Sequence, residues 1–153
     1  MKYYRLMENL PDRSPLGYGA AGARWNLKGI PLIYACNHLA LNYLELLSIK
    51  GPSVAKSIWS LITIEVSGEI PHLDPSSLPI DWRMRPYPGS TQQIGSQWAQ
   101  NKKSVYLKVP SCRIPLVGYS EEHNLLINPL HPDVNNLIKL VGSESVLYEI
   151  NSF

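Results

Sequence analysis

The spacing of hydrophobic positions changes at Asn37, where a predicted strand gives way to a predicted helix. Residues 30–36 form a short apolar, partly β-branched run after Gly29, which predicts a buried strand with Tyr34 near its end. From Asn37 onward, apolar residues recur every three or four positions, which predicts a helix with Asn37 as its N-cap and Gly51-Pro52 at its end. Glu45 stands inside the apolar run of this helix, where a carboxylate risks desolvation.

The same patterns predict five more strands and two more helices along the chain. The strands are expected at residues 3–6, 59–66, 105–109, 125–127 and 146–150, and the helices at 91–101 and 133–140. The long irregular loop at residues 9–22 is more typical of an element that covers a ligand than of a simple connection. Several strands, few helices and long connections predict an α+β or mixed α/β fold in which loops carry the ligand-binding groups.

Composition limits the classes of protein to which the chain can belong. A length of 153 residues predicts a single domain spanning residues 1–153. A net charge of +2, with lysines and arginines scattered, argues against direct nucleic-acid binding. Apolar runs are too short to cross a membrane, and the first residues do not read as a signal peptide. Two cysteines without CxxC spacing predict reduced thiols, and therefore a cytoplasmic location.

Taken one at a time, the polar residues do not identify a function. Arg24 reads as a loop residue, Tyr34 as a core aromatic, Glu45 as part of a solvated helix face and Ser111 as a turn residue after the strand at 105–109. The four histidines are spread too widely to predict a metal site, and P-loop, GxGxxG and GxSxG motifs are absent. These residues alone indicate only a small α+β domain.

The order of rare residues along the whole chain carries more information. The run from Gly22 to Ala35 (GARWNLKGIPLIYA) is followed by further matches at Ala40-Leu41, Leu44-Glu45, Leu78-Pro79, Trp82, Gly95, Trp98, Val109-Pro110-Ser111 and residues 124–132. This pattern resembles the RES-domain family, which is named for its arginine, glutamate and serine. That family supplies the toxins of RES–Xre toxin–antitoxin pairs, and the resemblance covers nearly the entire chain.

The resemblance implies a single domain similar to the ADP-ribosyltransferase toxins, with mixed β-sheets and a few flanking helices. It also implies a toxin that cleaves NAD as its substrate, without a prosthetic group or metal, and an Xre-type helix-turn-helix antitoxin as partner; a homodimer is left open. Carried over by position, Glu45, Arg24 and Tyr34 are expected to be catalytic, and Arg5, Arg24, Tyr34 and Ser111 to bind NAD.

Two features depart from the family pattern. The segment between Ser111 and Asn124 is longer than usual, with residues 117–120 inserted, and we expect it to reshape the mouth of the pocket. Cys36 and Cys112 stand where small residues are common, and we expect them to be neutral packing residues.

The chemistry of NAD cleavage matches these residue types. The reaction passes through an oxocarbenium-like transition state, which the carboxylate of Glu45 would stabilise. Arg24 offers a charged fork for the pyrophosphate, with Arg5 as a second clamp, and Tyr34 a face for the nicotinamide ring. Ser111 either donates to a phosphate or holds Glu45. The ADP-ribose acceptor is water, phosphate or a target molecule. The rival hypothesis is a non-catalytic binding module, against which the joint presence of all four residues argues.

Overall fold

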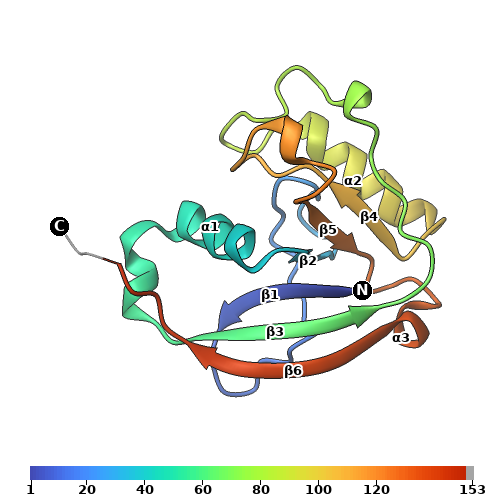
Figure 1. The fold of residues 1–153 in the computed structure, drawn as a ribbon. Coiled ribbons are helices and arrows are strands. Elements are labelled where there is room, and N and C mark those ends of the chain that lie inside the picture. The colour runs from blue at the N-terminus through green and yellow to red at the C-terminus, as the bar shows by residue number, and fades with distance from the viewer. Residues whose placement is uncertain (151–153) are drawn as a thin grey trace.

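The computed structural model describes residues 1–150, whose strands form one six-stranded sheet. The strands lie in the order β4-β5-β2-β1-β3-β6, and every neighbouring pair is antiparallel (Figure 1). Their bounds are Lys2–Glu8 for β1, Ile33–Cys36 for β2, Trp59–Val66 for β3, Tyr106–Val109 for β4, Asn124–Ile127 for β5 and Ile138–Val146 for β6. The sheet confirms the expected α+β class.

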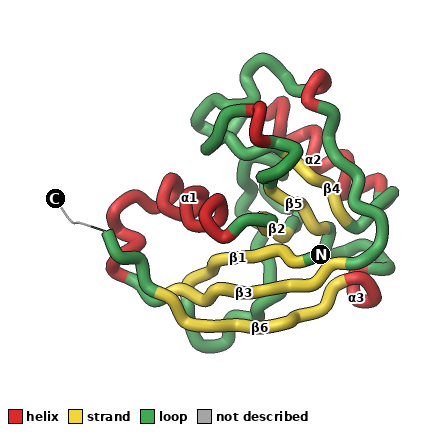
Figure 2. The backbone as a smooth tube through the Cα atoms, viewed as in Figure 1, coloured by secondary structure: helices red, strands yellow, loops and turns green. Residues whose placement is uncertain are grey.

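Two longer helices pack on different parts of this sheet, and loops make up most of the chain between β1 and β2 and between β3 and α2 (Figure 2). Helix α1 (Leu39–Lys50) lies against β1 and β2, while α2 (Gly89–Asn101) covers β4 and β5. The remaining helices are short: η1 (Gly51–Lys56), η2 (Pro75–Ser77), η3 (Leu116–Gly118) and α3 (Val134–Leu137). No helix among residues 1–150 has the length and apolar character needed to span a membrane.

The core is divided into clusters that anchor the loops as well as the helices. One cluster packs α2 and the loop ahead of β2 onto β4 and β5, with Trp25, Trp82 and Leu126 among its buried members. A second cluster, around Val54 and Trp59, lies beneath α1 and η1. Trp25 is only 2% exposed, so this part of the loop is packed into the core.

The predicted strands at 3–6, 30–36, 59–66, 105–109 and 125–127 are confirmed, with shifts of a few residues at their ends. The helix predicted after Asn37 begins at Leu39, and His38 occupies the N-cap position without a side-chain capping bond. Asn37 does not cap this helix, because its side chain instead accepts from the His123 N–H and donates to the Glu121 carbonyl, at 2.9 and 2.7 Å.

The prediction for the C-terminal part of the chain is wrong. The expected helix at 133–140 is the single turn α3, and the expected strand at 146–150 begins where β6 ends. Residues 138–146 pair with β3 from Val66 back to Trp59, and these ladder hydrogen bonds override the helical spacing read from a short apolar run. The predicted domain end at residue 153 lies outside the described residues.

Candidate active site

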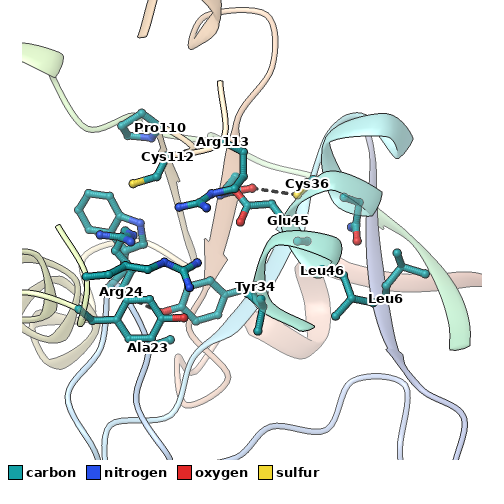
Figure 3. A pocket seen from close by; sticks show the side chains of 17 residues that line it. Leu6, Ala23, Arg24, Tyr34, Cys36, Glu45, Leu46, Pro110, Cys112 and Arg113 are labelled. Atoms are coloured by element: carbon teal, nitrogen blue, oxygen red, sulfur yellow. Dashed lines mark hydrogen bonds between the residues drawn. The ribbon is translucent and has the colours of Figure 1, made fainter. Parts of the chain in front are cut away.

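A pocket of about 260 Å³ lies between α1, the end of β2 and three loops, and it contains most of the predicted site residues. Arg24, Tyr34 and Glu45 all line it, from a loop, a strand and a helix respectively (Figure 3). The segment just after β4 supplies Pro110, Cys112 and Arg113 on another side. The structure therefore brings together at one concave surface three residues that are 10 or more positions apart in sequence.

Helix α2 fixes the loop that carries Arg24. A Cβ atom at Gly95 would lie 1.8 Å from the Trp25 carbonyl oxygen, so the helix backbone and the loop backbone are in direct contact. Three polar side chains on the same face of α2 bond the backbone of residues 23, 24 and 27 over 3.0, 2.6 and 2.9 Å. They are Gln92, Thr91 and Ser96. The position of Arg24 thus depends on a glycine that no side chain can replace without movement.

Arg24 is buried, at 8% exposed, and its guanidinium is only partly hydrogen-bonded. Its Nη1 donates to the carbonyls of Trp82 and Met84, at 2.7 and 3.0 Å. Its Nη2 is buried without any hydrogen-bond partner in the part of the chain that the structure describes. Buried donors are almost always paired, so an unpaired guanidinium nitrogen at a pocket indicates a place for an anionic or carbonyl ligand atom. One of the two terminal guanidinium nitrogens expected to bind the pyrophosphate, Nη1, therefore holds the loop at 82–84 instead.

Tyr34 presents its ring to the pocket and its hydroxyl to the loop. The hydroxyl donates to Asn26 Oδ1 at 2.5 Å and accepts from the Trp25 N–H at 3.2 Å. Burial raises the pKa of this hydroxyl above its usual value, so it remains a neutral hydrogen-bonding group. The ring is thus the part of Tyr34 that a ligand can meet.

Glu45 is held through one of its two carboxylate oxygens. Oε1 accepts from the Ser111 hydroxyl and, at 3.0 Å, from Asn124 Nδ2. No hydrogen bond among residues 1–150 engages Oε2. Ser111 is only 2% exposed and does not line the pocket, so of the two roles considered for it, this arrangement favours holding Glu45.

Arg5 is not brought together with the others. Its neighbour Leu6 lines the pocket, and because successive side chains of a strand point to opposite faces, Arg5 points away from it. Its guanidinium donates to the Pro15 carbonyl at 2.8 Å, and burial, with Arg13 nearby, lowers its pKa to about 10. The arrangement does not support Arg5 as a second clamp. Nor do residues 9–22 line the pocket, so the long loop does not cover it as expected.

Residues that sequence reasoning missed also line the pocket: Arg85, Tyr87, Arg113 and Asn124. Nη1 of Arg113 donates to the Ser48 hydroxyl, and the Arg24 and Arg85 guanidinium carbons lie 5.2 and 5.8 Å from the Tyr87 ring centroid. Within residues 1–150 none of the three arginines that line the pocket, Arg24, Arg85 and Arg113, forms a salt bridge. Three arginines against one carboxylate leave the pocket with a net positive charge. The sequence signal for Arg85, Tyr87 and Arg113 was their position near the recognised motifs at Trp82 and Ser111, and Asn124 begins the recognised run at residues 124–132.

The two departures from the family pattern lie in different places. Residues 117, 119 and 120 of the insertion line a second cavity of about 380 Å³ with His72 and Lys108, whereas Cys112 and Arg113, at the start of the same segment, line the first pocket. The effect of the longer segment on the mouth of the first pocket stays a prediction. Both cysteines are free thiols that line the first pocket. Cys36 is more than neutral packing, because its thiol donates to Asn124 Oδ1 at 2.8 Å.

Comparisons with known proteins agree with this arrangement. The sequence pattern of the RES domain matches residues 2–149. "Toxin Res" of Yersinia enterocolitica serotype O:8 / biotype 1B is 35% identical over 152 residues, which cover 97% of each chain. "Prs ADP-ribosylating toxin" of Sphingobium sp. (strain YBL2) is 35% identical over 130 residues, covering 82% of this chain and 78% of that one.

A solved structure shares the fold. The M. tuberculosis MbcT–MbcA toxin–antitoxin complex contains a chain that superposes with a TM-score of 0.72 over 95% of this chain and 84% of its own. The sequences are 18% identical, so this similarity establishes the architecture alone.

Proposed function

This chain belongs to the RES domain family, and on that premise we propose that it is the toxin of a toxin–antitoxin pair and cleaves NAD between nicotinamide and ribose. The names of its relatives support the toxin assignment, and one of them is called an ADP-ribosylating toxin. Cleavage of NAD is the step that any ADP-ribosyl transfer from NAD requires.

One observation carries the proposal: Arg24 and Glu45 line the same pocket, and among residues 1–150 Arg24 Nη2 has no hydrogen-bond partner and Glu45 is bonded through one oxygen only. The first needs an acceptor, and the second favours a group that becomes positive. NAD supplies both, because its pyrophosphate is anionic and its nicotinamide ribose develops positive charge as the bond breaks. The two further arginines increase the attraction for a diphosphate.

In the proposed reaction Glu45 stabilises the transition state. The nicotinamide nitrogen is already cationic in NAD, so the leaving group takes the bonding electron pair and departs neutral, without a general acid. The ribose becomes an oxocarbenium ion, and the carboxylate is fixed in advance where that charge develops. A preorganised group of this kind is worth roughly 2.7–4 kcal/mol of the activation barrier.

The remaining residues bind and orient the substrate. The Tyr34 ring stacks on the nicotinamide, which contributes about 0.5–1.5 kcal/mol. Arg24, through Nη2, and Arg113 bind the pyrophosphate, so Arg113 takes the place that the sequence analysis gave to Arg5. The cavity of about 260 Å³ is at the small end for ligand pockets, so the adenosine half extends over the rim at Arg85 and Tyr87.

The experiment is incubation of purified protein with NAD, with and without phosphate, followed by identification of the products. Free ADP-ribose, a phosphorylated ADP-ribose and a modified macromolecule correspond to water, phosphate and a target as acceptor. Nicotinamide should appear with the parent protein and fall at least a hundredfold with Glu45→Gln, which keeps size and removes charge. Binding of NAD without nicotinamide release would instead identify the non-catalytic binding module.

The partner proposed for this toxin is a helix-turn-helix antitoxin of the Xre type. A net positive pocket is a good receptor for an acidic side chain or a C-terminal carboxylate of such a partner. An inserted segment would block NAD without changing the fold. On this proposal NAD and the antitoxin compete for one site.

A further inference from the structure

We infer that Asn124 is a positioning residue that locks the catalytic carboxylate, with Cys36 setting the direction of its amide. This inference rests on the proposed function of Glu45. Asn124 lines the pocket, and its Nδ2 donates to Glu45 Oε1 at 3.0 Å. The Ser111 hydroxyl donates to the same oxygen. Two donors from different segments therefore fix one oxygen and turn Oε2 towards the ribose.

Asn124 is well placed for this task because it belongs to a strand that is hydrogen-bonded on both sides. It is the first residue of β5, and it pairs with Cys36 of β2 on one side and with Val109 of β4 on the other. Glu45 comes from a helix and has three rotatable side-chain bonds, so it needs external contacts to hold one conformation. A donor fixed on the sheet supplies that contact, as substrate-positioning groups must be held within a fraction of an ångström.

The amide of Asn124 works only in one orientation. If its oxygen faced Glu45, two acceptors would oppose each other and the carboxylate would be pushed away. The Cys36 thiol lies 2.8 Å from Oδ1 and donates to it, which leaves Nδ2 facing Glu45. Cys36 is 5% exposed, and burial raises the pKa of its thiol, so the proton needed for this bond is retained. The chain Cys36–Asn124–Glu45 is thus a directional network.

The test compares steady-state kinetics of NAD cleavage for the parent, Asn124→Leu and Asn124→Asp. Asn124→Leu should lower kcat about tenfold or more with KM for NAD within threefold, because binding groups are untouched. Asn124→Asp should be worse, since it replaces the donor with an acceptor of like charge. Cys36→Ala should lower kcat less than Asn124→Leu does, and Cys36→Ser, which restores a donor, should recover part of that loss.

A matched control separates positioning from stability. Asn128 follows the other end of β5, where its buried amide donates to the Ala99 carbonyl at 2.8 Å, outside the pocket lining. Asn128→Ala should lower Tm while kcat of the folded protein stays within twofold. A kcat for Asn124→Leu within threefold of the parent, or a loss confined to KM, would overturn the inference. So would an equal kcat loss in Asn128→Ala.

Crystal structures of the parent and Asn124→Leu give a readout that does not depend on turnover. The Glu45 carboxylate should leave its contact with Ser111 or occupy more than one conformation in the variant. An unmoved carboxylate refutes the positioning role even in a protein that cleaves NAD. Conversely, a parent that releases no nicotinamide refutes the proposed function, whatever the carboxylate does in the variant.

Discussion

Gly95→Ala tests whether the contact between α2 and the loop that carries Arg24 is needed for NAD cleavage. The added methyl carbon would lie 1.8 Å from the Trp25 carbonyl oxygen, 2.8 Å from its carbonyl carbon and 3.0 Å from its Cβ. Two of these atoms belong to the backbone, so no side-chain rotation relieves the clash. Helix or loop must separate by about 1.5 Å before ordinary van der Waals contact is restored. The loop that would move carries Arg24.

Stability and activity should respond to this change very differently. Overpacking costs about 1–3 kcal/mol, whereas alanine is better than glycine in a helix by about 1 kcal/mol. The net loss is therefore between about zero and 2 kcal/mol, or less than roughly 8 °C in Tm for a chain of this size. A displacement of about 1 Å in a substrate-positioning group can cost a hundredfold in rate. We expect turnover of NAD to fall about a hundredfold in a folded protein.

The assay is nicotinamide release measured beside thermal unfolding, with Gly89→Ala as control. Gly89 is the first residue of the same helix, and a Cβ there meets nothing within 4 Å. This control should keep parental turnover and the same or a slightly higher Tm. Turnover of Gly95→Ala within threefold of the parent would refute the reasoning, because it would mean that the loop moves without consequence or does not move.

Three further predictions concern the ring of Tyr34, the buried His123 and the partner. Tyr34→Phe should retain more NAD turnover than Tyr34→Ala because the stacking face survives, although Tm falls with the loss of the bonds to Trp25 and Asn26; equal inactivity would assign the catalytic role to the hydroxyl. Burial, with Lys108 and His38 nearby, lowers the pKa of His123 to about 4. Between pH 6.5 and 4 the unfolded chain therefore binds more protons than the folded protein, and the free energy of unfolding should fall as pH falls. Urea titrations at several pH values in this window give the free energy of unfolding, which should depend less on pH in His123→Gln than in the parent. An unchanged pH dependence would contradict the role given to His123. A non-hydrolysable NAD analogue should release the antitoxin from the complex, and Arg24→Ala should weaken antitoxin binding; affinity unaffected by saturating analogue would mean that the two do not share the pocket.

The sequence was sufficient to identify the family and to select three residues that line one pocket, because Arg24, Tyr34 and Glu45 stand at fixed places in a rare pattern. It could not assign Arg5, since which face of β1 a side chain takes depends on the register with β2 and β3. The same holds for the C-terminal segment, where pairing with β3 converts an ambiguous apolar run into β6.

The hydrogen-bond partners of the pocket residues also could not be predicted from sequence patterns. The division of the Arg24 guanidinium between a structural and an unpaired nitrogen depends on the backbone of residues 82–84, nearly sixty positions away. The contact of Asn124 with Glu45 spans 79 positions and requires β5 to lie beside β2. Motifs therefore locate the residues, and only the packed sheet and helices give the directions in which their polar atoms point.

The most direct test of the central claim is nicotinamide release from NAD by the purified toxin and by Glu45→Gln, with circular dichroism to confirm equal folding. The account predicts release by the parent and at least a hundredfold less by the variant, because the substitution removes the charge while preserving size. Release by Glu45→Gln within threefold of the parent, or no release by either protein, would contradict it.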